Sequence, residues 1–200
     1  MTSIGASCFY HCESLPEIRV PDSVRSIGSF AFGGCSSAAS INLPDGITKL
    51  RDGTFVGCSS LTEVVVPDSV TSFGYSVFES CTKLQRVNIP DGITLIDIET
   101  FQDCKSLTEI VLPDSVTEIG DYAFSYCIEL TSLNIPEAVT TIGMRAISSC
   151  DKLTTLSLSA NVSSIGTSAF SYCDMLIVRV PEGSYAHAWC EEYGVAYELI

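Results

Sequence analysis

The sequence predicts an α/β repeat solenoid, with a parallel β-sheet on one face and short helices on the other. Two series of residues recur through the 200-residue chain at intervals of 23. The first series is Cys12, Cys35, Cys58, Cys81, Cys104, Cys127, Cys150 and Cys173. The second is Pro21, Pro44, Pro67, Pro90, Pro113 and Pro136. Because a fixed period of about 20 to 50 residues indicates a repeat architecture, we expect about eight stacked units.

Each unit begins with an extended segment, which residues 107–112 illustrate. Leu107, Ile110 and Leu112 have the spacing L-x-x-I-x-L, whose last part alternates as a strand does. Pro113 ends the segment because proline has no N–H group to donate. The sequence therefore predicts a strand before each proline.

The second half of each unit returns the chain to its starting point. After the turn that follows proline, Val116 and Ile119 predict a second extended segment. Ala123 and Phe124 then precede Cys127 by four and three residues, which is the apolar stripe of a short helix or helical turn. A unit of this size cannot bury its own apolar face, so neighbouring units are expected to stack.

The repeated motif resembles that of the BspA-type leucine-rich repeats. The phrase CKSLTEIVLPDSVTEIGDYAFSY, residues 104–126, satisfies every position of C-x-x-L-x-x-I-x-I-P-x-x-V-x-x-I-G-x-x-A-F-x-x, with Leu112 in the second Ile position. The resemblance covers residues 1–181 and implies a leucine-rich-repeat arc. By the same resemblance, such proteins are bacterial and protist surface proteins implicated in adhesion.

The chain divides into a repeat region and a different ending. We expect residues 1–181 to form a solenoid of about eight 23-residue units that begins mid-repeat, and residues 182–200 to form a carboxy-terminal cap. In this cap Ser184 can begin a helix and Gly194 can end it, before a final strand. The amino terminus has no equivalent cap, so self-association or fraying is expected there.

Composition excludes two classes of partner. The net charge of −14 comes from 24 acidic and 10 basic residues, and it repels nucleic acid at long range. The chain also has no apolar run of the roughly 18 residues that a membrane helix needs, so membrane insertion is not expected.

The ten cysteines suggest no metal site, cofactor or catalytic thiol. Zinc ligands usually come in C-x-x-C pairs, and the closest pair here is Cys8 and Cys12. The only histidines, His11 and His187, lie near opposite ends of the chain, so no enzyme activity is expected. We expect a ladder of buried thiols, with a ladder of disulfides as the less favoured alternative, and leave Cys8 and Cys190 unassigned.

A second ladder consists of the acids that follow the prolines. They are Asp22, Asp45, Asp68, Asp91 and Asp114. In principle such carboxylates could hold calcium between units. The favoured interpretation is that each one bonds the backbone of its own turn.

The outward positions of the first strand form the candidate binding face. They cannot belong to the core, and they vary more than their neighbours along this one chain. Glu-x-Val at 63–65 recurs 46 residues later, and Ser-x-Asn at 40–42 recurs 92 residues later, which indicates that the gene grew by doubling a two-unit block of 46 residues. The candidate residues are Glu17, Arg19, Asn42, Glu63, Val65, Arg86, Asn88, Glu109, Val111, Ser132 and Asn134.

The sequence favours a non-catalytic scaffold that binds a protein or glycan ligand through this face. The family resemblance adds a secreted or cell-surface location and host matrix proteins as candidate ligands. Three alternatives remain open: a merely solvated sheet face, a passive spacer or assembly module, and the targeting arm of a larger enzyme or sensor.

Overall fold

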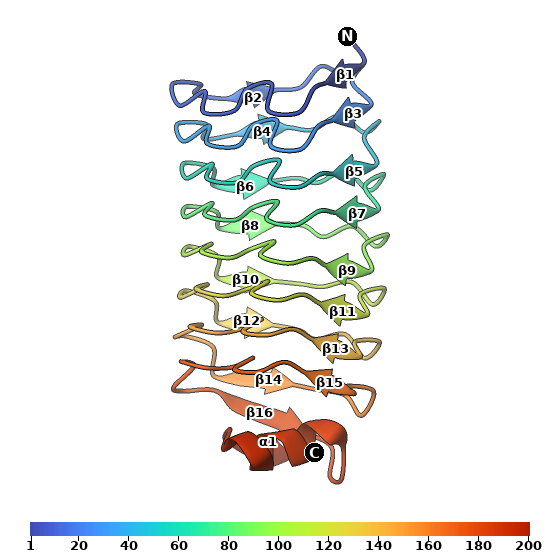
Figure 1. Ribbon diagram of the computed structural model, residues 1–200, viewed down its shortest axis with the longest axis vertical. Helices are drawn as coiled ribbons and strands as arrows, with labels where there is room; N and C mark the ends of the chain where they lie inside the picture. Colours follow the sequence, from blue (N-terminus) through green and yellow to red (C-terminus); the bar gives the residue numbers. More distant parts are fainter.

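The computed structural model describes residues 1–200 as a parallel β-solenoid of about nine coils of about 23 residues. The coils stack in one column, with the two chain termini at opposite ends (Figure 1). Each coil contributes one short strand to each of two parallel columns of strands. The predicted solenoid, its repeat length and its parallel pairing are therefore confirmed.

The even-numbered strands form the column that we call the sheet face. They are β2 (Ile18–Arg19), β4 (Ile41–Asn42), β6 (Glu63–Val64), β8 (Arg86–Val87), β10 (Glu109–Ile110), β12 (Ser132–Leu133), β14 (Thr155–Ser157) and β16 (Ile177–Val180). The odd-numbered strands form the column that we call the odd face. They are β1 (Ser3–Ile4), β3 (Ser26–Ile27), β5 (Lys49–Leu50), β7 (Ser72–Phe73), β9 (Leu95–Ile96), β11 (Glu118–Ile119), β13 (Thr141–Ile142) and β15 (Ser164–Ile165).

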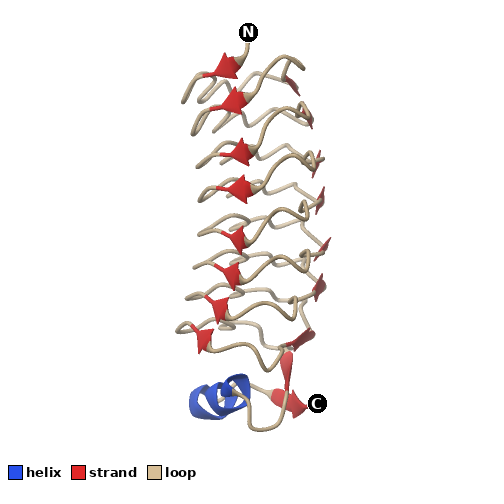
Figure 2. Ribbon diagram, turned by 90° about the vertical axis from the view of Figure 1, so that its right-hand side faces the viewer, coloured by secondary structure: helices blue, strands red, loops and turns tan.

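The expected short helices are absent, which corrects the sequence prediction. The segment after each odd strand, such as residues 120–127, is a series of turns, and we call this side of the molecule the turn face. Figure 2 shows that loops and turns complete each coil and that helix occurs only at the carboxy-terminal end. The predicted apolar residues Ala123, Phe124 and Cys127 are nevertheless fully buried.

Backbone geometry explains why these segments are not helical. Tyr122 and Tyr126 have φ angles of 57° and 61°, in the left-handed region that a right-handed helix excludes. The Phe124 N–H donates to the Ala146 carbonyl of the next coil at 2.7 Å, whereas the Ser125 N–H donates to Tyr122 in its own coil at 3.0 Å. Alternate backbone amides therefore donate to the next coil along the solenoid axis. The buried apolar residues keep their spacing of three and four residues without forming a helix.

The core is a stack of equivalent residues from successive coils. Phe55, Phe78, Phe101 and Phe124 are fully buried, and their rings stack with centroids 5.4–5.7 Å apart. The cysteines beside them pack as small apolar residues, because the thiol of Cys58 donates to the Phe32 carbonyl at 3.2 Å and the others repeat this contact. All ten cysteines are free thiols, and the periodic ones are buried except Cys12, which is exposed because no coil precedes it in this chain.

The strand columns are interrupted in a regular way. On the sheet face β2 pairs with β4, β6 with β8 and β10 with β12, whereas no pairing joins β4 to β6 or β8 to β10. On the odd face β1 pairs with β3 and β5 with β7, and β9, β11, β13 and β15 form one sheet. In the first half of the solenoid, each junction between coils is thus paired on one face and open on the other.

The carboxy-terminal end is closed by α1 (Tyr185–Tyr193) and β17 (Tyr197–Leu199). The Ser184 side chain accepts from the His187 N–H at the start of the helix, and Gly194 ends it with φ of 66°. Trp189 of α1 packs edge-on against Phe170 of the last coil, with ring centroids 5.6 Å apart. No helix of this protein has the length and apolar character that crossing a membrane requires.

Candidate binding face

All eleven residues that the sequence singles out are exposed and lie on or beside the even-numbered strands. The strand register aligns them in two rows along the solenoid axis. Glu63 lies opposite Arg86 in the first row, and Arg19 lies opposite Asn42 in the second. The parallel stacking of coils therefore brings together residues that are 23 positions apart in the chain.

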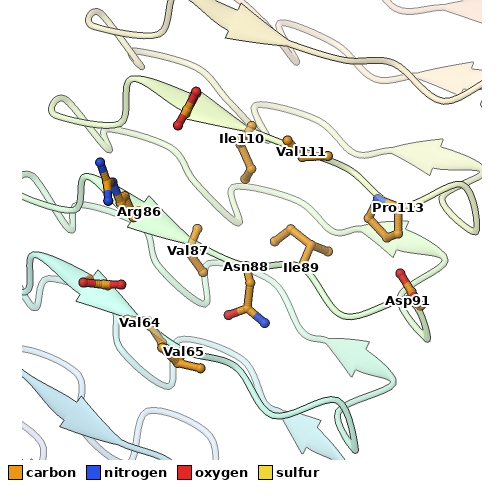
Figure 3. A pocket seen from close by; sticks show the side chains of 12 residues that line it. Val64, Val65, Arg86, Val87, Asn88, Ile89, Asp91, Ile110, Val111 and Pro113 are labelled. Atoms are coloured by element: carbon orange, nitrogen blue, oxygen red, sulfur yellow. The ribbon is translucent and has the colours of Figure 1, made fainter.

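Three shallow hollows on the sheet face are lined by these residues. The hollow over β6, β8 and β10 has a volume of about 520 Å³ and contains Glu63, Arg86 and Glu109 in its lining. Figure 3 shows Arg86 at one side of it and Asp91 and Pro113 at the other. A hollow of about 580 Å³ lies over β2 and β4, and one of about 320 Å³ lies over β12 and β14.

The asparagines of this face are already bonded to the protein. Asn88 accepts a hydrogen bond from the Val66 N–H at 2.7 Å and donates one to the Val66 carbonyl at 2.8 Å. Asn42 and Asn134 make the same pair of bonds to the preceding coil. Each side-chain amide thus adds two hydrogen bonds between neighbouring coils. These three asparagines therefore stabilise the fold, and these amide groups are already hydrogen bonded within the protein.

At the junctions between these coil pairs, serine side chains make the hydrogen bonds to the preceding coil. The Ser69 hydroxyl donates to the Ile47 carbonyl at 2.7 Å, and the Ser115 hydroxyl donates to the Ile93 carbonyl at 2.6 Å. Asparagine junctions coincide with pairing on the sheet face, and serine junctions coincide with pairing on the odd face. The alternation of asparagine and serine along the chain therefore corresponds to an alternation in how neighbouring coils are joined.

The charged residues of the hollow over β6, β8 and β10 form no ion pair within the protein. The ion pairs of the sheet face join Arg19 to Glu17 at 2.9 Å and Arg179 to Glu198 at 3.1 Å. Neither pair includes Arg86, Glu63 or Glu109, although these three lie on successive strands. Their charges are therefore available for a charged or hydrogen-bonding partner.

Two valines expose apolar surface next to these charges. Val65 is 67% exposed and Val111 is 72% exposed, both in the lining of the central hollow. In Figure 3 they lie on either side of Asn88. The alternation in the sequence predicts that these valines point outward. Together with the unpaired charged residues, they allow the central hollow to make both apolar and ionic contacts with a ligand.

The aspartates that follow the prolines behave differently from the prediction. None of their carboxylates accepts a hydrogen bond from its own turn, which is closed by a backbone bond such as that from the Val116 N–H to the Pro113 carbonyl at 3.1 Å. No group of three or more His, Cys, Asp or Glu side chains is placed to hold a metal ion. The ladder is a row of exposed carboxylates.

The buried thiols are poorly suited to nucleophilic chemistry. Burial raises the pKa of the Cys58 thiol to about 12, and it also raises the pKa values of Cys81, Cys104 and Cys127 well above the ordinary value. A thiolate is the reactive form of cysteine, so these groups stay protonated at neutral pH. His11 and His187 lie in the first coil and in α1, far from one another along the solenoid.

The chain belongs to the BspA-type leucine-rich repeat family, whose model matches residues 2–105 and 78–186. A leucine-rich repeat protein from Bacteroides ovatus is 29% identical with a TM-score of 0.67, over 90% of this chain and 59% of that one. One from Eubacterium ventriosum is 27% identical with a TM-score of 0.72, over 80% and 43%. The T. pallidum leucine-rich repeat protein is 32% identical with a TM-score of 0.60, over 99% and 79%. No curated protein matches the chain in sequence.

These matches confirm the family that the repeat motif predicts. They indicate a repeat-protein fold that is consistent with a binding scaffold, and they indicate no catalytic family. The chain spans 59% and 43% of the first two structures, so the activity of a whole protein does not follow from them.

Proposed function

We propose that this protein is a non-catalytic scaffold that binds a protein or glycan through its sheet face. The observation that carries the proposal is the central hollow, where Glu63, Arg86 and Glu109 are exposed, unpaired and adjacent to two exposed valines. An exposed side chain without an internal partner can be used for recognition at no cost to the fold. The bonded asparagines contribute shape to this surface, and the free charges contribute specificity.

The form of the face favours a macromolecular ligand. The three hollows are open depressions aligned along the solenoid, and their linings together include all eleven candidate residues. A ligand that spans several coils would contact them in sequence, whereas a small molecule would contact only one. Solenoids generally bind partners over such extended surfaces.

A secreted or cell-surface location and a role in adhesion form part of this proposal. Their support is the family resemblance, because proteins with this repeat are implicated in attachment to host matrix proteins and in contact between cells. The resemblance transfers a class of role and no particular ligand.

The test is a binding screen of the purified protein against matrix proteins and glycans. The variant Glu63→Ala, Arg86→Ala, Glu109→Ala removes the free charges of the hollow. The control Lys49→Ala, Glu118→Ala, Glu137→Ala removes the same number of exposed acids and bases from other positions. We expect saturable binding that the first variant loses by at least about tenfold and the control retains.

Two results would oppose the proposal. Equal binding by both variants would place the site elsewhere on the molecule. No binding by any of the three folded proteins would favour a spacer, or the targeting arm of a protein that binds through another domain.

A further inference from the structure

The backbone ladder of the turn face ends at the last coil with donors that have no acceptor. At the preceding junction, Ile147 N–H donates to the Ala169 carbonyl and Ser149 N–H donates to the Ser171 carbonyl, both at 2.9 Å. The equivalent donors one coil later are the N–H groups of Ser168, Phe170 and Tyr172. None of them has a hydrogen-bond acceptor within the chain.

Two of these three residues, Ser168 and Phe170, line a hollow between the last coil and α1. It has a volume of about 290 Å³, and its lining residues come from both elements and include no charged side chain. They are Thr167, Ser168, Phe170, Ser171, Trp189, Tyr193 and Val195. This hollow lies at the carboxy-terminal end, apart from the sheet face and independent of the function proposed for that face.

The hydroxyl groups in this lining are free, unlike those of the coils before them. Ser125 and Ser148, which precede Ser171 in the same row, are hydrogen bonded to one another at 2.8 Å. The side chains of Thr167, Ser168 and Ser171 make no hydrogen bond within the protein. The hollow thus combines unpaired hydroxyl and amide groups, which can bind the oxygen atoms of a ligand.

The opposite wall of the hollow is aromatic. Trp189 and Tyr193 stack with ring centroids 4.7 Å apart and an interplanar angle of 23°. Trp189 is 5% exposed and Tyr193 is 52% exposed, so the tyrosine ring is the accessible part of the pair. Stacked aromatic rings provide a flat apolar surface beside the polar groups of the coil.

We propose that this hollow binds a single uncharged sugar ring. A sugar ring has an apolar C–H face that packs on an aromatic ring, and an edge of hydroxyl oxygens that pairs with N–H and O–H groups. The absence of charged lining residues disfavours an ionic ligand, since a buried charge needs a partner. A peptide chain that continued the ladder would meet α1, which packs against β15, β16 and β17 and closes this end.

The single tryptophan makes the proposal directly testable. Trp189 is the only tryptophan of the chain and lines this hollow, so a ligand bound there should change its fluorescence. The probes are glucose, galactose, mannose and N-acetylglucosamine, each titrated to about 50 mM, which covers the weak affinities usual for small ligands. We expect a saturable change in emission with at least one of these sugars.

Paired variants decide whether the hollow is responsible. Thr167→Val combined with Ser171→Ala should weaken the response by at least about tenfold, because the sugar hydroxyls lose their partners. Thr154→Val changes an exposed threonine that also lacks side-chain hydrogen bonds and lies outside the hollow, so it should leave the response unchanged. Circular dichroism would verify that all variants are folded.

Two outcomes would overturn the proposal. One is no change in emission with any of the four sugars, and if a peptide with the sequence of residues 120–127 then gives a response, the hollow is assigned to a polypeptide chain. The other is a response to sugar that persists in the double variant.

Discussion

Asn88 illustrates how single residues of the sheet face serve the fold. Its amide binds both the N–H and the carbonyl of Val66, so it replaces a backbone step between β6 and β8. The residues at the same position in neighbouring coils are Val65 and Val111, which make no such bond and expose most of their surface. The asparagines and valines that alternate in this row therefore have different roles, although all of them point outward. The asparagine joins neighbouring coils, and the valines expose apolar surface.

The change Asn88→Ala should lower the free energy of unfolding by about 1–2 kcal/mol, because two hydrogen bonds are lost. Urea denaturation measures this difference. Ser132→Ala is the matched control, since this exposed serine has no side-chain bond and its loss should cost less than about 0.5 kcal/mol. Equal stability of the two variants would show that the Asn88 amide does not support the fold.

The buried thiols predict a loss of stability at high pH. Burial raises the pKa of Cys58 from 9.0 to about 12, so the unfolded chain releases this proton at a lower pH than the folded one. The stability from the protonated thiol is complete below about pH 9 and is lost as the pH rises towards 12. Urea denaturation between about pH 8 and pH 11 measures this loss.

Cys58→Ala isolates the contribution of one thiol. The variant is less stable at neutral pH because it leaves a small cavity, but its stability should fall less steeply above about pH 9. If both proteins have the same slope, the Cys58 thiol does not titrate as its burial requires.

At the scale of elements, the turn face shows how close packing replaces helical structure. Two residues in each coil have positive φ, and most of them are not glycine, as Ser76 and Glu99 illustrate. Gly53 occupies the same position and also makes room for a neighbour, because a Cβ there would lie 2.3 Å from the Phe30 ring. The glycine is thus required by the aromatic residue of the coil before it.

Gly53→Ala should destabilise the protein by about 1–3 kcal/mol, through strain at positive φ and displacement of Phe30. Gly5→Ala is the control, since its Cβ would have no neighbour within 4 Å. Thermal or urea unfolding measures both. In a Phe30→Ala background the cost of Gly53→Ala should shrink, and an undiminished cost would contradict the proposed clash.

At the scale of the whole molecule, the two ends differ. The outer edges of β1 and β2 have no pairing strand in this chain, and an apolar hollow of about 420 Å³ lined by Ile4, Phe9 and Leu15 lies there. At the other end, α1 and β17 cover the last coil. An open strand edge beside apolar surface favours association with another chain.

We therefore expect concentration-dependent self-association at the amino-terminal end, or fast amide exchange in residues 1–20. Light scattering and hydrogen exchange measure the two alternatives. A strict monomer in which these amides are protected would contradict the prediction. Leu15→Glu, at a half-buried residue of this hollow, should suppress association if this edge is the interface, whereas Thr154→Glu at an exposed position should not.

The sequence by itself determined the repeat period, the two extended segments of each coil, the buried positions and the family. These features depend on the spacing of residue types within one 23-residue unit, which can be read from the amino-acid sequence. It also identified the outward positions of the sheet face, because alternation in a strand is local. Tertiary structure alone decided that the turn face contains no helix, which outward side chains are free, and where donors remain unpaired. All three depend on hydrogen bonds to a residue in the neighbouring coil, such as Asn88 to Val66 and Phe124 to Ala146, and spacing within one coil does not specify those partners.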